Sequence, residues 1–311
     1  MSATLLQSLL NGLASGGAYA LFALGYTLVF SVLGVINFAQ GALFTLGGYL
    51  TFLLMGGAIG INGALPGLSL PVALPFWLAL ILAGGGSAMA SLVVERVAFA
   101  PLRRQGAEPL LYLITSLGAG VVLVNLLQIL MGSESYAFPA SALGGWPASI
   151  AIGSARVRSV QLLLLVISSL LVVVLGVWLE RSRNGKALRA VAEDPTTSQL
   201  LGINSEAMIR LAFAISGFLA GVAGGLVALS VSISGPYFGI SYGLKGLAVL
   251  VLGGLGSVPG AIVGGLLMGI VEALVPTEAS GYRDALAFAI LFAVLLLRPR
   301  GLLGRPEVEK V

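Results

Sequence analysis

The chain has 311 residues, of which 58% are hydrophobic and only 9% are charged, and its formal net charge is +4. Soluble domains carry roughly a quarter charged residues, so this composition excludes an ordinary soluble fold. There is no cysteine and no histidine, which removes disulfides, thiolate metal sites and the commonest general base. Apolar runs of about 20 residues recur, the length of a helix that crosses the hydrocarbon core of a bilayer. We therefore predict an all-α, polytopic transmembrane helical bundle.

Hydropathy predicts about nine spans, and eight or ten would also fit the pattern. The first run has no basic residue before it, so we expect a retained span and not a cleaved signal peptide. Several runs are short and rich in glycine, which allows broken or re-entrant helices where backbone lines a cavity. The predicted spans are near residues 5–34, 38–55, 71–94, 110–131, 160–180, 209–231, 243–255, 258–275 and 284–298.

The basic residues predict the orientation of the bundle. Most of them follow the third, fifth and last predicted spans, and the positive-inside rule places these three segments in the cytoplasm. They do not form one basic patch, so we expect no nucleic-acid partner. Nine spans then put the N-terminus outside. The residues are Arg96, Arg103, Arg104, Arg181, Arg183, Lys186, Arg189, Arg298, Arg300, Arg305 and Lys310, with Arg156, Arg158 and Arg283 as exceptions on the other side.

Two glycine-containing stretches resemble each other, QGALFTLGG at 40–48 and KGLAVLVLGG at 245–254. Each follows a long helix rich in small residues, and on the predicted topology they run in opposite directions. Inverted repeats of this kind are typical of transporters, with the solute path between them near the midplane. We predict one permease domain over residues 1–311, with possible repeats at 1–131 and 209–298.

The charged segment 181–208 between the fifth and sixth spans has the pattern of two short helices. The first is predicted at residues 186–192. Asp194 followed by Pro195 is a helix-start signal, because the carboxylate caps free N–H groups and proline fits the first turn. The second helix then runs over 195–201 and ends at Gly202. The segment either anchors to lipid headgroups or acts as a coupling loop, with Arg189, Glu193 and Asp194 on its contact surface.

Polar side chains inside spans are costly and often line a pathway. Lys245 is predicted at the outer end of a short span, where it either snorkels to the interface or attracts the carboxylate of an incoming solute. The others could instead cap a helix break or bond a neighbouring helix. The candidate pathway residues are Asn37, Gln40, Asn125, Gln128, Lys245 and Glu272.

Three stretches resemble the permease subunits of bacterial ABC importers for branched-chain amino acids, the high-affinity leucine/isoleucine/valine family. They are residues 19–50, 185–204 and 250–274, and their order and spacing run over most of the chain. Gln40 departs from the family, in which many members have histidine, and its role is therefore open.

The resemblance implies an inner-membrane importer with a periplasmic binding protein, two permease subunits and two cytoplasmic ATPases. It also implies that the loop at 185–204 docks into an ATPase groove. The chain has no GxxxxGK(S/T) phosphate-binding loop, so we expect no cofactor here and no enzyme activity, with ATP and Mg bound by the partner subunits.

The sequence leaves alternatives open. The solute could be urea, a short amide or another small carboxylate, and the second permease could be a paralogue or a copy of this chain. An ion-coupled secondary transporter would need an intramembrane acidic relay, for which Glu272 is the one acidic residue well inside a predicted span. An intramembrane enzyme is disfavoured, because histidine and cysteine are absent and the carboxylates are not paired in the sequence.

Overall fold

Nine apolar helices form the body of the molecule in this computed structural model, which describes all residues except 1, 140–145, 148, 153–154, 276–280 and 305–311. Each predicted span coincides with one of these helices, so the prediction of an all-α membrane bundle is confirmed. Five are long enough and apolar enough to cross a membrane, while α2, α10 and α11 are shorter. The helices are α1 (Ser2–Leu33), α2 (Gln40–Leu54), α3 (Phe76–Val94), α5 (Pro109–Met131), α6 (Ser159–Arg181), α9 (Ser205–Val231), α10 (Phe238–Gly253), α11 (Val258–Leu274) and α12 (Arg283–Leu297).

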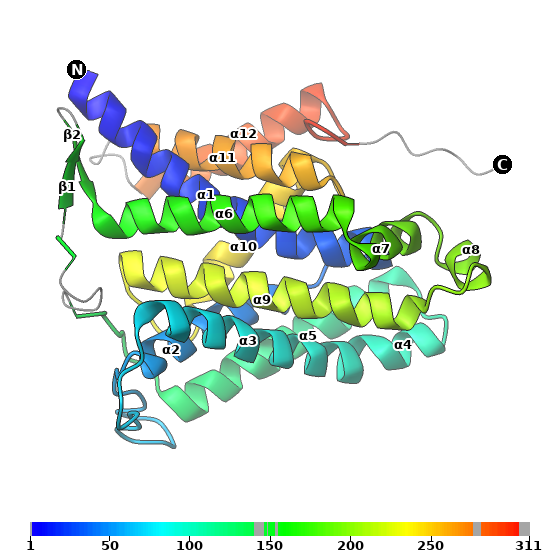
Figure 1. Cartoon of the computed structure of the whole chain (residues 1–311), viewed down its shortest axis with the longest axis horizontal. Helices are drawn as coiled ribbons and strands as arrows, with labels where there is room; N and C mark the ends of the chain where they lie inside the picture. Colours follow the sequence, from blue (N-terminus) through cyan, green and yellow to red (C-terminus); the bar gives the residue numbers. More distant parts are fainter. Residues whose placement is uncertain (1, 140–145, 148, 153–154, 276–280, 305–311) are drawn as a thin grey trace.

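Short elements lie at the two ends of the bundle (Figure 1). At one end α3 continues through a π-helical turn, η1 (Glu95–Phe99), into α4 (Ala100–Arg104), beside α7 (Arg183–Glu193) and α8 (Pro195–Leu200). At the other end lie the N-terminus and an antiparallel hairpin of β1 (Ser149–Ile152) and β2 (Ala155–Arg158), which the sequence did not predict.

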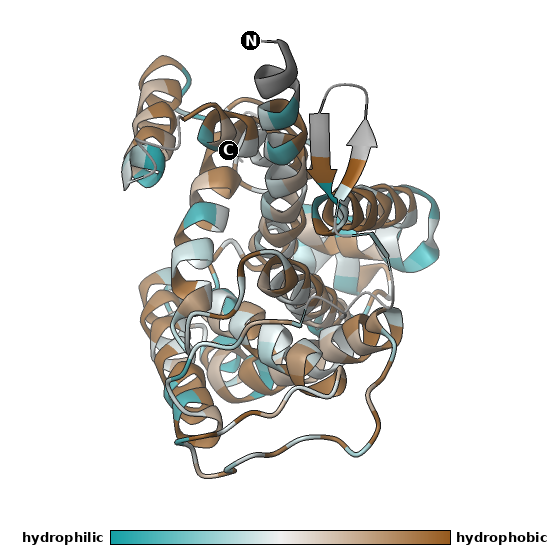
Figure 2. Ribbon diagram, turned by 90° about the vertical axis from the view of Figure 1, so that its left-hand side faces the viewer, coloured by the Kyte–Doolittle hydropathy of each residue, from teal (hydrophilic) through white to brown (hydrophobic). Residues whose placement is uncertain are grey.

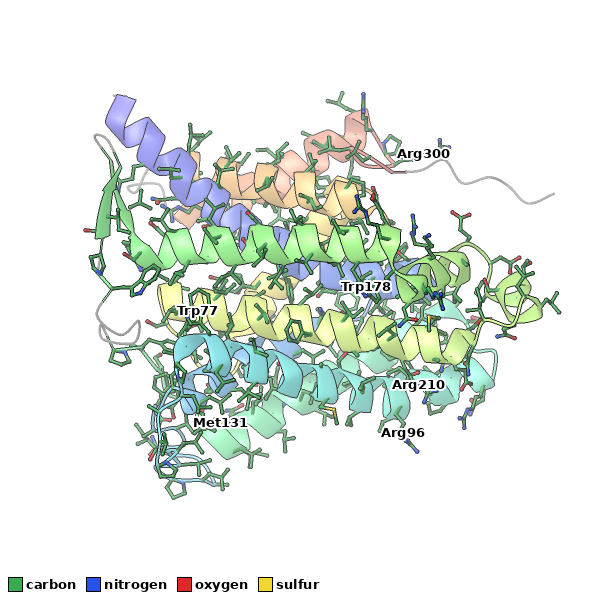
Figure 3. The ribbon with its side chains drawn as sticks, in the orientation of Figure 1. Trp77, Arg96, Met131, Trp178, Arg210 and Arg300 are labelled. Carbon is green, nitrogen blue, oxygen red and sulfur yellow. The ribbon has the colours of Figure 1, made fainter. Side chains whose placement is uncertain are left out.

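The described parts of the three basic segments lie at the end that carries α4, α7 and α8 (Figures 1 and 3), and the predicted Arg305 and Lys310 lie outside the described residues. Arg96, Arg210 and Arg300 are at this end, whereas Trp77 lies at the end with the hairpin. The shared position agrees with the predicted orientation, in which these segments face the cytoplasm. We call the end with α7 and α8 the cytoplasmic end and the end with the hairpin the outer end.

The long helices α1 and α9 form the centre of the bundle. α3 packs along α9 and α11 packs along α1, while α2 and α10 contact each other between them. Glycines allow these close approaches: a Cβ on Gly47 would lie 2.3 Å from the Cα of Gly221. Gly16 and Gly269 meet in the same way, since small residues let helix backbones approach closely.

The packing of the two halves is reciprocal. In the first half α5 contacts α2, and in the second half α12 contacts α10. The third helix of each half packs against the central helix of the other half, α3 against α9 and α11 against α1. Such exchange suits the predicted repeats at 1–131 and 209–298, which stay a prediction. The two similar glycine-containing stretches do not begin at equivalent positions in their helices. Gln40 is the first residue of α2, whereas Lys245 lies in the middle of α10.

A C-terminal strap, residues 298–304, returns to the cytoplasmic end of α10. The N–H groups of Leu302 and Leu303 donate to the carbonyls of Leu252 and Gly253, each at 2.9 Å. The approach is possible because Gly301, with φ of +78°, and Gly254, with φ of +107°, adopt backbone that glycine favours.

The exterior of the helices is largely apolar. Seen from the outer end, hydrophobic colouring dominates most helices, and hydrophilic colouring is confined to short patches (Figure 2). Large side chains such as Ile81, Val122 and Val173 are more than half exposed. Because the remaining apolar surface would be costly in water, these faces suit contact with lipid.

Candidate functional site

The cytoplasmic loop is two helices joined at one residue. Ser182 caps α7, its hydroxyl accepting from the N–H of Gly185 at 2.8 Å, so that the helix begins earlier than the predicted 186. Leu188 and Val191 are buried and fix α7 against the bundle. α7 contacts α1, α6 and α9 there.

The predicted start of α8 is confirmed, and the helix ends at Leu200, one residue before the predicted end. Asp194 Oδ1 accepts from the N–H groups of Thr196 at 2.9 Å and Thr197 at 3.1 Å, and Pro195 occupies the first position. Gly202, with φ of +83°, follows the last turn. A six-residue helix with such a cap holds a defined shape although it projects from the bundle.

Two large apolar side chains mark the tip of α8. Leu200 is 84% exposed and Leu201 is 77% exposed. Arg189 lies on the exposed side of α7, its guanidinium donating to the carbonyl of Glu180 at 3.3 Å, and Glu193 is the exposed last residue of α7. The structure therefore brings the predicted contact residues to one projecting end, together with two leucines that the sequence pattern did not single out.

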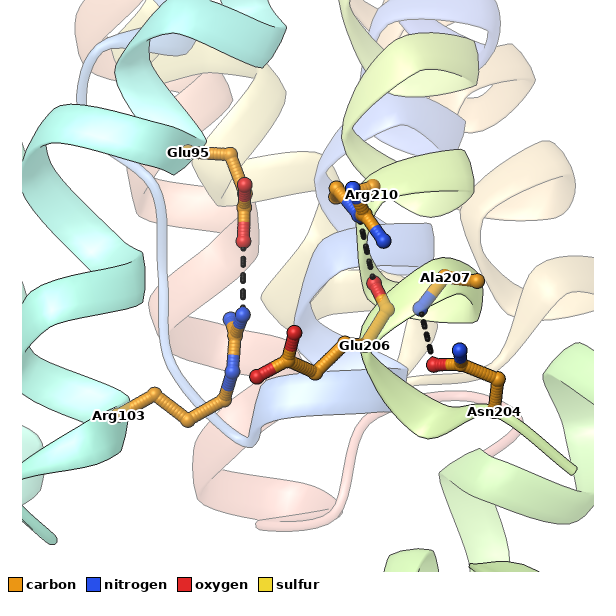
Figure 4. A network of polar contacts seen from close by, with 6 residues as sticks. All are labelled: Glu95, Arg103, Asn204, Glu206, Ala207 and Arg210. Atoms are coloured by element: carbon orange, nitrogen blue, oxygen red, sulfur yellow. Dashed lines mark hydrogen bonds and ion pairs between the residues drawn. The ribbon is translucent and has the colours of Figure 1, made fainter.

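The neighbouring cytoplasmic ends of α3 and α9 are also fixed by polar contacts (Figure 4). Arg103 pairs with the buried carboxylate of Glu95 at 2.9 Å across the π-helical turn. Asn204 caps α9 by accepting from the N–H of Ala207 at 3.0 Å. The cap by Asn204 thus fixes the start of α9, the helix that both α7 and α8 contact.

Asn37 and Gln40 lie at the break between α1 and α2, as predicted, and both are buried. Asn37 Oδ1 accepts from the N–H of Ala39 at 3.1 Å and shapes the turn. Gln40 uses both ends of its amide on Ser216 of α9, each at 3.0 Å. In this conformation Gln40 links α2 to α9 instead of facing an open path.

Asn125 and Gln128 lie one turn apart on α5. Asn125 donates to the carbonyl of Val121 in its own helix at 2.8 Å. Gln128 lies near the outer end, where its oxygen accepts from the hydroxyl of Tyr237 at 3.3 Å and its nitrogen reaches Ser133 at 3.3 Å. Of the two, Gln128 is the residue that connects α5 to the start of α10.

Lys245 lies in the middle of α10, so its predicted place at an outer span end is wrong. Its ammonium contacts Glu272 of α11 at 2.9 Å and Asp284 of α12 at 2.8 Å. The hydroxyl of Tyr19 in α1 donates to Glu272 at 2.6 Å. We call these four residues the charged cluster. The contacts occupy Lys245 with two carboxylates and hold four helices together.

Sequence reasoning identified Lys245 and Glu272 but not the other half of this cluster. Tyr19 and Asp284 come from the first and last helices, and no local pattern signals such a contact. Among the described residues, no group of three or more histidine, cysteine, aspartate or glutamate side chains is placed to hold a metal ion.

The chain is an apolar helical bundle with a charged cluster between its helices and a loop that projects at the cytoplasmic end. These features define a polytopic membrane protein of the transport class. The chain belongs to the family described as "Branched-chain amino acid transport system / permease component", whose sequence profile matches residues 8–295. It is thus a permease component, and the resemblance found in the three sequence stretches is confirmed.

Curated relatives of the chain are permeases of the same kind. It is 39% identical over 310 residues to the "High-affinity branched-chain amino acid transport system permease protein LivH" of Escherichia coli, covering 98% of this chain and 97% of the relative. It is 38% identical over 313 residues to permease protein BraD of Pseudomonas aeruginosa, covering 98% of each. Permease protein LivM of Salmonella typhimurium is 28% identical over 316 residues, which are 94% of this chain and 69% of the relative.

Proposed function

We propose that this chain is the membrane-spanning permease of an ATP-driven importer in the bacterial inner membrane and that it carries branched-chain or other hydrophobic amino acids. The observation that carries the proposal is full-length similarity to permeases of high-affinity branched-chain amino acid transport systems. Transport requires no bond to be made or broken by this chain, which acts by alternating access.

The energy comes from partner subunits in this proposal. The sequence has no phosphate-binding loop motif, so two cytoplasmic ATPases bind ATP and Mg. A periplasmic binding protein delivers the solute at the outer end. The second permease is a paralogue, as the similarity to the separately named LivM protein suggests, and a pair of identical chains is the alternative.

The tip of α8 is the contact with an ATPase. Leu200 and Leu201 are exposed on a helix whose start is fixed by Asp194 and whose neighbour α7 is fixed by buried Leu188. Exposed leucines at the centre of a contact gain from burial in a groove. A rigid contact of this kind passes domain closure from an ATPase to the spans.

The first experiment measures uptake of radiolabelled leucine in bacteria that lack this gene, with and without the gene on a plasmid. Restored uptake supports the proposed solute class. Unchanged leucine uptake together with restored uptake of urea, a short amide or another carboxylate would move the solute to that class and leave the importer in place.

A second experiment tests α8 with the pair Leu200→Glu and Leu201→Glu. Fully burying a leucine side chain contributes about 1.5–3 kcal/mol, so we expect uptake and co-purification of the ATPase to fall at least about tenfold. Gln199→Glu adds one negative charge at an exposed polar position of α8 and is the control for charge on this helix. Unimpaired ATPase binding by the leucine variant would refute the docking surface and favour contact with lipid headgroups.

A further inference from the structure

A small pocket lies at the outer end, where α9 stops and α10 begins. We call it the outer serine pocket; its volume is about 320 Å³, within the range of roughly 300–1,000 Å³ that small-molecule sites occupy. The residues that matter for the argument are Ser232, Ser234, Tyr237, Phe238, Ser241 and Tyr242.

The serine hydroxyls of the pocket are not used by the fold. Within the part of the chain that the structure describes, the side chains of Ser232, Ser234 and Ser241 make no hydrogen bond. Buried serines in the helices behave differently: Ser91 donates to a carbonyl of α9 at 2.7 Å and Ser216 to the carbonyl of Gly25 at 2.8 Å. Ser232 is half-buried and Ser234 and Ser241 are exposed, and the hydroxyls of these three lining residues are available to a ligand, each as a donor and an acceptor.

The backbone of the pocket is held in an unfavourable conformation. Ser232 has φ of 74° and ψ of 162°, and it is the one non-glycine residue with positive φ among the described residues. Such a conformation costs about 1–3 kcal/mol and persists only where neighbours impose it. Here Ile233 is fixed by two hydrogen bonds to the backbone of Tyr136, at 2.8 and 2.9 Å. Strain of this kind concentrates at ligand sites.

The surroundings of the pocket are polar on one side and aromatic on the other. Tyr237 connects it to Gln128 of α5, unlike the apolar exposed faces of α3 and α6. The rings of Phe238 and Tyr242 lie 5.3 Å apart and form a wall, with Phe44 stacked on Tyr242 at 5.0 Å. The pocket therefore offers polar and aromatic contacts side by side, and Val231, which also lines it, is 58% exposed.

The distribution of charge around the pocket favours a solute without net charge. No side chain that lines the pocket is charged, and Lys245, one helical turn below Ser241, is held by two carboxylates. α10 begins at Phe238, so the partial positive end of its backbone faces this region. A zwitterion gives hydroxyls both a donor and an acceptor, whereas an isolated anion or cation would lack a counter-charge.

We propose that the outer serine pocket binds a zwitterionic amino acid on its way to the path, with the ammonium and carboxylate on the hydroxyls of Ser232, Ser234 and Ser241 and the apolar side chain against Phe238 and Tyr242. The inference rests on the proposed function, because it takes the solute to be a hydrophobic amino acid. In this proposal the serine hydroxyls bind the charged groups of the solute, whereas the sequence analysis considered Lys245 for the solute's carboxylate.

The chain has no cysteine, so a single Ser241→Cys substitution creates one thiol of similar size in an otherwise thiol-free permease. The complete importer in proteoliposomes, with partner subunits free of reactive cysteine, is treated with a membrane-impermeant methanethiosulfonate reagent at the outer face. We expect modification to lower leucine uptake at least about tenfold, and leucine, but not lysine or glutamate, to slow the modification. Ser69→Cys, on an exposed outer loop, is the control and should be modified without loss of uptake.

A further experiment with the periplasmic binding protein distinguishes solute binding in the pocket from docking of the binding protein on the same surface. Leucine alone at high concentration should protect the thiol, and the empty binding protein should not. The proposal is overturned if Ser241→Cys is not modified, if its full modification leaves uptake unchanged, or if the empty binding protein protects as well as leucine does.

A variant that keeps the pocket open gives a second readout. A hydrogen bond to a charged group contributes about 1.5–3 kcal/mol, so Ser241→Ala should slow leucine uptake about tenfold, and Ser69→Ala should not. Equal rates would overturn the proposal. Failure of the unmodified importer to carry leucine would instead contradict the proposed function.

Discussion

Removing the ammonium from the charged cluster should be the most damaging single change in the outer half of the bundle. The side chains of Lys245 and Glu272 are only 14% and 10% exposed, whereas Asp284 is 61% exposed. Lys245→Met keeps the length of the side chain but leaves the carboxylate of Glu272 with the hydroxyl of Tyr19 as its remaining partner.

The cost follows from these exposures. Breaking a buried ion pair leaves an uncompensated charge and costs about 3–5 kcal/mol, and the remaining bond from Tyr19 favours the lower end. The contact with Asp284 is largely solvated and contributes about 0–1 kcal/mol. With an unfolding entropy of about 2.1 cal/mol/K per residue, about 3 kcal/mol corresponds for 311 residues to a fall of about 5 °C in the midpoint of thermal unfolding.

The assay is thermal unfolding of the purified protein in detergent, followed by the fluorescence of its three tryptophans. The double variant Lys245→Met/Glu272→Gln removes the orphaned charge and should recover most of the loss. Asp284→Asn is the control and should shift the midpoint by no more than about 2 °C. An Asp284→Asn variant as unstable as Lys245→Met, or a double variant no better than Lys245→Met alone, would refute the reasoning.

Three further substitutions test other contacts. Gly47→Ala forces a Cβ against the backbone of Gly221 and should cost about 1–3 kcal/mol by overpacking, while Gly85→Ala, with open space around it, should be neutral or slightly stabilising in the same unfolding assay. Asp194→Ala removes the cap of α8 and about 1 kcal/mol of local stability, so amide hydrogen exchange in the first turn of α8 should rise about fivefold, with no change in α7. Ser216→Ala removes a hydroxyl shared by α1 and α2 and should lower the free energy of unfolding by about 1 kcal/mol; an unchanged midpoint would show that these contacts do not stabilise the bundle.

Hydropathy located every apolar helix because the requirement for about 20 apolar residues is local and strong. It failed on details set by backbone hydrogen bonds. α10 begins at Phe238, before the predicted 243, since glycine and serine in its first two turns lower the hydropathy while Gly239 donates to Thr45 of α2 at 2.9 Å. That shift moves Lys245 from the end of a helix to its middle.

The same distinction applies to the functional residues. Asp194, Pro195 and Gly202 were predictable, because helix caps are encoded by neighbours in the sequence. The partners of Lys245 and the hydroxyls of the outer serine pocket were not, since they come from separate helices or from a loop whose path the sequence does not show. The exposure of Leu200 likewise depends on how far α8 projects from the bundle.

The geometry of Glu272 also bears on ion-coupled transport. A proton relay needs an acidic group that gains and loses a proton during the cycle. One oxygen of Glu272 contacts the ammonium of Lys245 at 2.9 Å and the other accepts from the hydroxyl of Tyr19 at 2.6 Å, so both oxygens are used in contacts between helices. This arrangement suits a structural tie better than a relay.

The C-terminal strap gives α10 a second attachment at the cytoplasmic surface. Its hydrogen bonds to Leu252 and Gly253 join the last turn of α10 to the segment that follows α12, while the first turn of α10 forms part of the outer serine pocket. The 16 residues of α10 are about 24 Å long. One rigid rod therefore links the outer pocket to the cytoplasmic tail, and a spectroscopic probe placed on the strap would report on events at the opposite face of the membrane.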